Sequence, residues 1–308
     1  MAIGGPTKRD EPARATVKVG TAGWSYDDWK GIVYPRTMPR GVHPLSFIAR
    51  LFDTVEINST FYRPPQQGYC YNWLKKAEPN ERFRFTVKLW KRYTHERETW
   101  PSAGEEKFFK KSIEPLTRSN KLGALLVQFP WSFKNTAENH KWLADLFDCF
   151  GEYPLALEIR HASWNVPEVY EYLAERRVAF CNIDQPVFRG SLKPSARVTA
   201  RVGYVRLHGQ NYANWFKEDA GRDARYDYLY SEEELDPWVE KIQGIRKIAD
   251  EVYVITNNHY RGQAVVNAFQ ILNKLTGDTF DIPDSLVEVY PQLKKIARAT
   301  GQMTLSFE

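Results

Sequence analysis

Eight short β-rich runs recur along this chain at a mean spacing of roughly 34 residues, and most segments between them carry apolar residues at helical spacing. The runs are Val17–Gly20, Thr54–Asn58, Phe83–Lys88, Ala124–Phe129, Leu155–Arg160, Val178–Asp184, Tyr204–His208 and Val252–Asn257. Eight alternating strand–helix units with right-handed crossovers leave few topologies besides the (β/α)8 barrel. The sequence therefore predicts an α/β protein built as a single TIM-type barrel.

Two connections depart from the regular unit. Residues 185–202 show no helical pattern, and the Tyr-rich stretch 209–231 is unusually long, so we expect long loops after strands 6 and 7 of the kind that form lids or binding loops. An open doubly wound sheet is the alternative, disfavoured because neither a GxGxxG turn nor a Walker motif occurs. The polar residues 1–15 are expected to be a disordered leader ahead of one domain, 16–308.

Charge and composition narrow the classes of partner. Lys and Arg number 43 against 38 Asp and Glu, and this net charge of +5 suits an anionic ligand but is too small by itself to indicate nucleic-acid binding. No apolar run approaches the roughly 20 residues of a membrane-spanning helix, and the first residues lack the apolar stretch of a signal peptide. We therefore expect a cytoplasmic protein without a membrane partner. The three cysteines show no CxxC pairing, which predicts neither a disulfide framework nor a zinc knuckle.

Alternation within the runs predicts which side chains enter the barrel. Apolar residues such as Val55 and Ile57 alternate with polar ones such as Glu56, and an unpaired charge beneath an amphipathic helix is costly, so the polar set must face inward. On the same argument Cys181 is expected to face the helices. The inward set, near the carboxyl ends of the strands where barrels bind ligands, comprises Glu56, Asn58, Lys88, Gln128, Glu158, Arg160, Asp184, Arg206 and His208.

Other chemistry-bearing residues also follow the predicted strands. His95, His161 and His208 come directly after or at the ends of the third, fifth and seventh runs, and rings such as Trp24 could stack on a sugar or a base. The predicted ligand-binding set is Glu56, Asn58, Lys88, His95, Gln128, Arg160, His161, Arg206, Asn257, Asn258, Trp24 and Tyr62.

Several stretches also carry a family resemblance. They are GTAGWSYDDWKG, FDTVEINSTFYRPP, LLVQFP, LEIRHASW, YVRLHG and VYVITNNHYRGQAVVNA. In this order, from about residue 17 to about residue 275, the chain resembles the YecE-like proteins, which form the domain-of-unknown-function family number 72. The resemblance implies a TIM barrel, in agreement with the strand count, and implies no established reaction. Ala22 stands where a small Ser is usual in the family.

The preferred function is an enzyme that uses acid/base chemistry on a small polar anion, such as a sugar or a phosphorylated compound. Glu158 is expected as general acid or base, with Asp184 and His208 tuning or sharing the proton transfer. Lys88, Arg160 and Arg206 are expected to bind the anion. The reaction type, whether hydrolase, isomerase or lyase, is left open.

Cofactor and partner expectations follow from the same residues. The sequence requires no cofactor, and a single divalent metal ion, if present, would be held by Glu158, Asp184 and His208. Two alternative functions stay open. One is a metal-dependent phosphodiesterase or nuclease whose loop 88–97 engages a nucleic-acid backbone. The other is a ligand-binding or scaffold barrel with a structural ionic network. The oligomeric state is not predicted.

Overall fold

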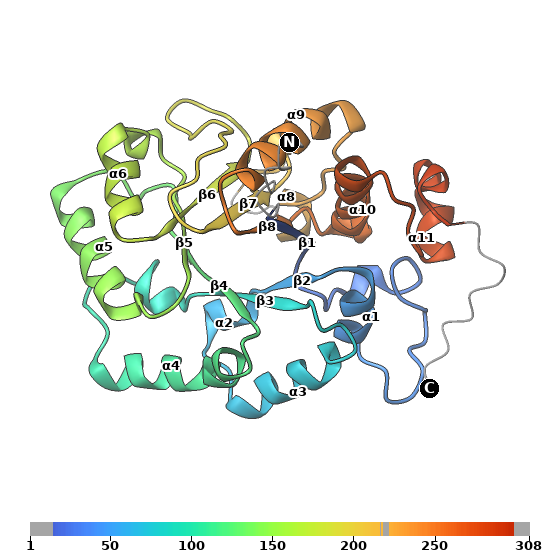
Figure 1. Ribbon diagram of the computed structural model, residues 1–308, viewed down its shortest axis with the longest axis horizontal. Coiled ribbons are helices and arrows are strands. Elements are labelled where there is room, and N and C mark those ends of the chain that lie inside the picture. Colours follow the sequence, from blue (N-terminus) through green and yellow to red (C-terminus); the bar gives the residue numbers. More distant parts are fainter. Residues whose placement is uncertain (1–14, 216, 218–221, 299–308) are drawn as a thin grey trace, which may run out of the picture.

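Eight parallel strands close into a barrel in the computed structural model, which describes residues 15–215, 217 and 222–298 (Figure 1). The strands are β1 (Thr16–Ala22), β2 (Thr54–Ile57), β3 (Arg84–Lys88), β4 (Leu122–Gln128), β5 (Leu155–Glu158), β6 (Ala179–Asp184), β7 (Val202–Leu207) and β8 (Glu251–Thr256). Each strand pairs with the next in sequence, and β8 pairs with β1 to close the cylinder. Each of the eight predicted runs overlaps one of these strands, which confirms the predicted fold.

Helices surround the barrel as an outer layer (Figure 1). They are α1 (Pro44–Leu51), α3 (Gln67–Ala77), α4 (Ala103–Arg118), α5 (Ala137–Phe150), α6 (Pro167–Glu175), α9 (Glu232–Arg246) and α10 (Gln263–Thr276), followed by α11 (Asp284–Val289). Short helical turns are α2 (Ser59–Tyr62), η1 (Asp27–Trp29), η2 (Lys91–Tyr93), η3 (Ala162–Trp164), η4 (Tyr260–Gly262) and η5 (Pro291–Lys295). None of the helices in the described ranges has the length and apolar character that crossing a membrane requires.

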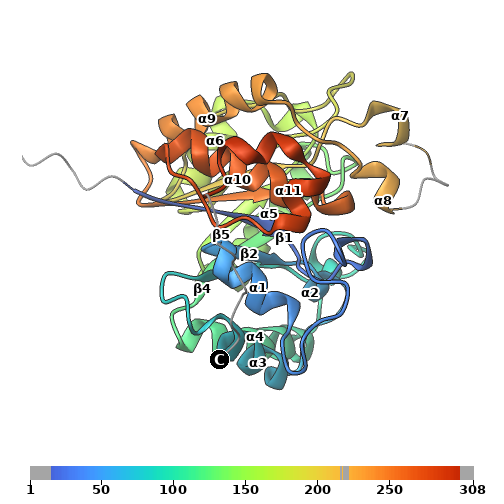
Figure 2. The ribbon, with the colours of Figure 1, turned by 90° about the vertical axis from the view of Figure 1, so that its right-hand side faces the viewer.

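Both predicted long loops are present. The chain forms no helix over 185–201, between β6 and β7. After β7 come two short helices, α7 (Tyr212–Trp215) and α8 (Arg222–Arg225), which Figure 2 shows together at one end of the barrel, apart from the helical ring. Of the expected leader, residues 1–14 lie outside the described residues. Ala15 is buried, and its carbonyl accepts a hydrogen bond from Arg246 Nε (2.9 Å).

The apolar members of the alternating strands pack between the barrel and its helices. Val55 and Ile57 of β2 and Val87 of β3 are buried in one large core with the inner faces of the helices, such as Leu45 and Ile48 of α1. This is the packing that amphipathic helices on a barrel require. The alternation predicted for β2, β3, β5 and β7 is therefore confirmed.

The barrel interior holds a second, smaller apolar cluster. Small residues there face two large rings, since Ala124 and Ala156 share the cluster with Tyr204 and Tyr253. Space for Tyr253 also depends on Gly123, where a Cβ would come 2.1 Å from the Tyr253 hydroxyl. Bulky and small side chains thus complement each other across the interior.

The orientation predicted for β6 is wrong. Cys181 and Ile183 lie in the interior cluster, although their apolar character had placed them against the helices. Asn182 takes the outer face because the loop after β6 supplies partners there. Its Oδ1 accepts hydrogen bonds from the Arg197 backbone N–H (2.7 Å) and from Ser195 Oγ (2.8 Å).

Candidate functional site

A buried ionic cluster spans the barrel interior above Tyr204. The Arg206 guanidinium donates to Glu56 Oε1 (2.7 Å) through one terminal nitrogen and to Glu158 through the other. All three side chains are at most 2% exposed. The Tyr204 hydroxyl donates to the second oxygen of Glu56 (2.9 Å). Buried charges are tolerated when they are paired and hydrogen-bonded in this way, so strands β2, β5 and β7 are tied together through one guanidinium.

Glu158 is the most heavily bonded member of this cluster. Arg160 donates to its Oε1 through Nε (3.0 Å) and a terminal nitrogen (2.8 Å), in addition to the contact from Arg206. Burial opposes ionisation of this carboxyl group. The guanidinium groups of Arg206 and Arg160, together with the hydrogen bond from His208, outweigh that effect and hold the pKa of Glu158 well below its usual range. Glu158 is therefore an ionised carboxylate that anchors two arginines.

His208 is fully buried beside Glu158. Its Nε2 lies 3.3 Å from Glu158 Oε1, and the Asn257 side-chain amide lies 2.9 Å from its Nδ1. Both contacts are satisfied by the neutral tautomer in which Nε2–H donates to Glu158 and Nδ1 accepts from Asn257. Burial and the nearby Arg206 lower the pKa of His208 to about 3, against the opposing effect of Glu158.

A neutral buried histidine makes stability depend on pH. Below about pH 6.5 the unfolded chain binds a proton at His208 that the native state does not, so native stability falls as the pH falls. Between pH 6.5 and 5 we expect this residue to account for a loss of about 2 kcal/mol. The measurement is urea unfolding of the wild type and of His208→Asn at several pH values. The variant should show the shallower pH dependence, and parallel curves would contradict the assignment.

A polar cavity of about 140 Å³ opens above the ionic cluster at the carboxyl ends of the strands. Its lining residues come from the ends of β2, β3, β4, β5, β7 and β8, from α2, and from the loops after β1, β7 and β8. They are Tyr26, Asn58, Phe61, Tyr62, Lys88, Gln128, Arg160, Arg206, Tyr226, Asn257 and His259. A space of this size and polarity holds a few water molecules or one small anionic group.

Lys88 ends β3 and points its amine into this cavity. Nζ lies 4.0 Å from the centroid of the Phe61 ring, and within the described ranges it makes neither a hydrogen bond nor an ion pair. Burial, reinforced by Arg206, lowers the pKa of Lys88 to about 7. The carboxylates of Glu56 and Glu158 favour the charged form, but their oxygens are already engaged by arginines.

Arg206 Nε, a donor, and Asn58 Oδ1 are polar atoms of lining residues that are buried without a hydrogen-bond partner in the described structure. Buried polar groups in native proteins are nearly always hydrogen-bonded, so unsatisfied ones on residues that line a cavity indicate a place for a ligand or ordered water. Together with Lys88 they make the cavity the candidate functional site.

A family model described as a protein of unknown function, DUF72, matches residues 18–288. The chain belongs to the DUF72 family. The UPF0759 protein YunF of Bacillus subtilis is 32% identical over 272 residues, covering 84% of this chain and 94% of that relative. This membership confirms the family resemblance found in the sequence.

Solved structures of DUF72 proteins are similar to this one. A DUF72 family protein from Thermotoga maritima is 36% identical with a TM-score of 0.74, covering 84% of this chain and 99% of that one. Another from Enterococcus faecalis is 27% identical with a TM-score of 0.73, covering 84% of this chain and 95% of that one. Neither protein is named for a reaction, so these likenesses support the barrel fold without indicating a chemistry.

The predicted site residues of this DUF72 chain fall into three groups. Asn58, Tyr62, Lys88, Gln128, Arg160, Arg206 and Asn257 line the cavity. Glu56, Glu158 and His208 are buried in the ionic cluster beneath it, and His95 stands at the rim with its ring against Phe61 (4.8 Å between centroids). Trp24, His161, Asn258 and Asp184 are directed elsewhere.

The first three of these outliers have structural partners. Trp24 packs edge-on against Trp73 (5.8 Å between centroids), and His161 Nδ1 accepts from the Ser163 backbone N–H at the start of η3. Asn258 donates to the Tyr228 carbonyl and to Asn267 Oδ1, both at 2.7 Å. The strand-end position that suggested a ligand role for these residues is equally suited to holding loops.

Asp184 is turned away from the cluster, so the predicted grouping with Glu158 and His208 is wrong. Its carboxylate accepts from the Tyr230 hydroxyl and from Gln210 Nε2 (3.0 Å), on the helix side of β6. The predicted metal-ligand set is therefore not assembled, and among the described residues no group of three His, Cys, Asp or Glu side chains is placed to hold a metal ion.

Four cavity residues of the DUF72 chain were missing from the predicted set. Tyr26 and His259 stack with 4.4 Å between ring centroids, and Phe61 and Tyr226 complete the aromatic wall. Three of them had a usable signal in the sequence. His259 follows the eighth strand, Phe61 precedes Tyr62, and Tyr226 lies in the Tyr-rich loop that was expected to carry binding residues.

The loop 88–97, expected to grip phosphates if the protein bound nucleic acid, satisfies most of its cations internally. Lys91 pairs with Glu96 (2.5 Å), and Arg92 pairs with Glu105 (3.1 Å) while donating to two backbone carbonyls. Arg97 donates to Asn139 (2.8 Å) and lies over the Phe133 ring. These contacts fix the loop and leave few of its positive charges available to bind the phosphates of a nucleic acid.

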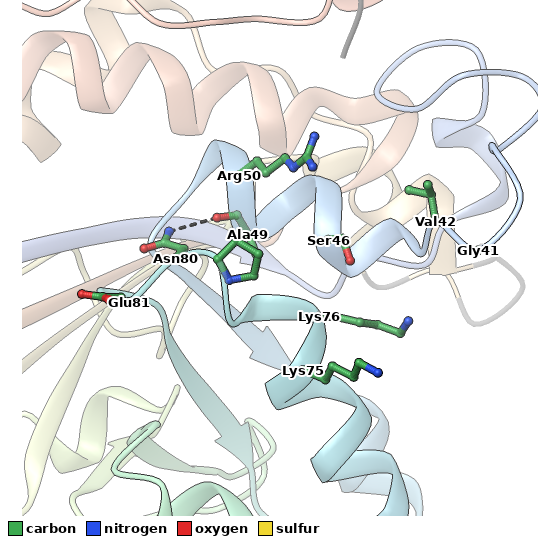
Figure 3. Close-up of a pocket in the computed structure, with 10 residues that line it drawn as sticks. Gly41, Val42, Ser46, Ala49, Arg50, Lys75, Lys76, Asn80 and Glu81 are labelled. Atoms are coloured by element: carbon green, nitrogen blue, oxygen red, sulfur yellow. Dashed lines mark hydrogen bonds between the residues drawn. The ribbon is translucent and has the colours of Figure 1, made fainter. Parts of the chain in front are cut away.

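A second cleft, of about 580 Å³, lies outside the barrel between α1 and α3 (Figure 3). Arg50 stands on one wall, while Lys75 and Lys76 extend from α3 on the other. Figure 3 draws a hydrogen bond between two of the lining residues, from Asn80 Nδ2 to the Ala49 carbonyl (2.9 Å). Arg50 and Lys75 are exposed to solvent, unlike the buried charges of the barrel mouth, so the barrel mouth is the stronger candidate site.

Proposed function

We propose that this chain is an enzyme that binds a small polar anion at the mouth of the barrel and carries out acid/base chemistry on it. The observation that carries the proposal is the amine of Lys88, which faces the cavity without a counter-ion. A cation held out of bulk water without a paired carboxylate is unfavourable unless a ligand supplies the negative charge.

The charges around the cavity support an anionic ligand. Lys88, Arg160 and Arg206 bring three positive charges, and Glu56 and Glu158 bring two negative ones. Because Asp184 lies outside the site, one positive charge is left over. The free Arg206 Nε and the amides of the lining residues can then donate hydrogen bonds to the oxygens of a carboxylate or phosphate.

In this proposal Lys88 takes the proton-transfer role that the sequence suggested for Glu158. A general base works best when its pKa lies near the operating pH, and burial brings the pKa of Lys88 to about 7. Glu158 is fully buried and bonded to both arginines, and its lowered pKa makes it a poor base. We assign Glu158 and His208 as positioning residues that orient Arg160 and Arg206.

The alternatives receive less support. Internal pairing of the cations in loop 88–97 favours a small ligand over a nucleic-acid backbone. A purely structural ionic network would leave no reason for Lys88 or Arg206 Nε to lack partners at an open cavity.

Sulfate binding tests the proposal, because sulfate is an anion that does not itself titrate near neutral pH. Anion binding should favour the protonated amine, so the affinity should fall as the pH rises above about 7, by up to about tenfold per pH unit. Isothermal titration calorimetry at pH 6 to 9 measures this dependence.

Matched variants locate the effect. Lys88→Met should abolish the pH dependence and most of the binding, whereas Lys91→Met, on the neighbouring turn, should behave as the wild type. Equal sulfate binding by the wild type and Lys88→Met would refute the proposed site.

A further inference from the structure

The cavity places an amine nucleophile and an anion-binding group in one small space. Lys88 Nζ has the Phe61 ring as its close neighbour, and Arg160 and Arg206 line the same cavity of about 140 Å³. A molecule with only a few non-hydrogen atoms would therefore present its anionic group to the arginines while another of its atoms faces the amine. This juxtaposition suggests more than proton transfer.

From this arrangement we infer that Lys88 forms an imine with the carbonyl carbon of a small substrate that also carries a carboxylate or phosphate, such as a 2-oxo acid. The inference rests on the proposed function, because it uses the same anion site and names the substrate class. Imine formation would also explain why the Lys88 amine, which lacks a counter-ion, lies in a cavity that can hold a carbonyl group.

The amine has the properties that this step requires. Lysine attacks carbonyl groups only in its neutral form, and desolvation or a neighbouring cation increases the fraction of that form at neutral pH. Burial and Arg206 have this effect on Lys88. The nearby thiol of Cys181 is not an alternative nucleophile, since it lies within the barrel interior, where burial raises its pKa well above the usual value.

The step balances without a redox partner. The neutral Lys88 amine attacks the carbonyl carbon, a C–N bond forms, and a proton moves from nitrogen to the carbonyl oxygen to give a carbinolamine. The hydroxyl group then takes up one further proton and leaves as water, which produces a protonated imine. Solvent entering at the mouth can supply that proton and accept the water. The imine cation stays among Arg160, Arg206 and the anionic group that they bind.

Reductive trapping tests the inference directly. The protein is incubated with pyruvate or glyoxylate at pH 7, sodium cyanoborohydride is added, and tryptic peptides are analysed by mass spectrometry. The reduced adduct should accumulate on Lys88 on the order of tenfold or more above other lysines, because surface lysines are almost fully protonated at this pH.

Two variants separate this inference from the proposed function. Lys88→Arg keeps the positive charge but cannot form an imine, so it should still bind sulfate while giving no adduct at position 88. Lys91→Met should be trapped at Lys88 as efficiently as the wild type. Calorimetric sulfate binding is measured on the same wild-type preparations.

The outcomes are distinct. Sulfate binding that requires Lys88, with no adduct on Lys88 or with adducts spread evenly over all lysines, would overturn the imine while leaving the anion site in place. Loss of both signals in the wild type would overturn the proposed function as well. If Lys88→Arg does not fold, Lys88→Met serves as the adduct-free control.

Discussion

Replacing Arg206 with methionine is expected to lower the free energy of unfolding by about 3–5 kcal/mol. The substitution leaves Glu56 and Glu158 fully buried without the guanidinium that bonds both of them. Tyr204 and Arg160 still contact one carboxylate each, but neither can bridge the two. Urea unfolding followed by both tryptophan fluorescence and circular dichroism measures the change and checks that the two transitions coincide.

Controls show whether the loss arises from the buried charges. Arg201→Met removes an arginine that pairs with Asp250 at the surface, where its side chain is 91% exposed, and should cost less than about 1 kcal/mol. Adding Glu56→Gln and Glu158→Gln to Arg206→Met should recover part of the loss, because the uncompensated charges are then removed. A loss no larger than that of Arg201→Met would contradict the buried cluster.

Replacing Lys88 with methionine should instead raise stability at neutral pH, by about 2–4 kcal/mol. Methionine keeps much of the side-chain length and removes a cation that has no counter-ion in the described structure. Groups that serve binding or catalysis are commonly unfavourable for folding, and a stabilising substitution is a sign of such a group.

The pH dependence of this gain has a definite sign. Between the lowered pKa of about 7 in the native state and the ordinary value of 10.5, the unfolded chain binds the proton more tightly. Wild-type stability therefore rises with pH over this range through Lys88, and the advantage of Lys88→Met shrinks by about 1.4 kcal/mol per pH unit. Thermal unfolding of the two proteins at pH 7, 8 and 9 measures the difference. A destabilised variant at pH 7 would refute the account of Lys88.

The strands and most of the site could be predicted because two constraints coincide in β2, β3, β5 and β7. Successive side chains of a strand alternate between its two faces, and the face beneath the helices must be apolar. Residues beneath the helices must be apolar, so Glu56, Lys88, Glu158 and Arg206 had to point inward, and they do. Which face of a strand packs against the helices follows from the residues of that strand alone, so it can be inferred from one sequence.

The prediction for β6 is wrong because each face of this strand can be accommodated either inside the barrel or against the helices. Cys181 is small enough to lie beside Tyr204 and Tyr253 inside the barrel, and polar residues on the outer face find partners in distant segments. Asp184 bonds to Tyr230 and Gln210, contacts that exist only after the chain has returned past β7. Alternation within one strand carries no information about such partners.

The sequence likewise could not show that Lys88 lacks a counter-ion. With Asp184 beside Glu56 and Glu158, three carboxylates would balance Lys88, Arg160 and Arg206, whereas the structure turns Asp184 away and leaves one positive charge in excess. Which carboxylates are engaged by Arg160 and Arg206 depends on the register of the closed sheet.

The most direct test of the central claim is the ionisation of Lys88 itself. Lysine side-chain carbons can be followed by heteronuclear NMR across pH 5 to 11, with Lys88→Arg identifying the resonance. The account predicts a pKa of about 7 in the ligand-free protein and an upward shift when sulfate is added. Titration near 10.5, unchanged by sulfate, would contradict it.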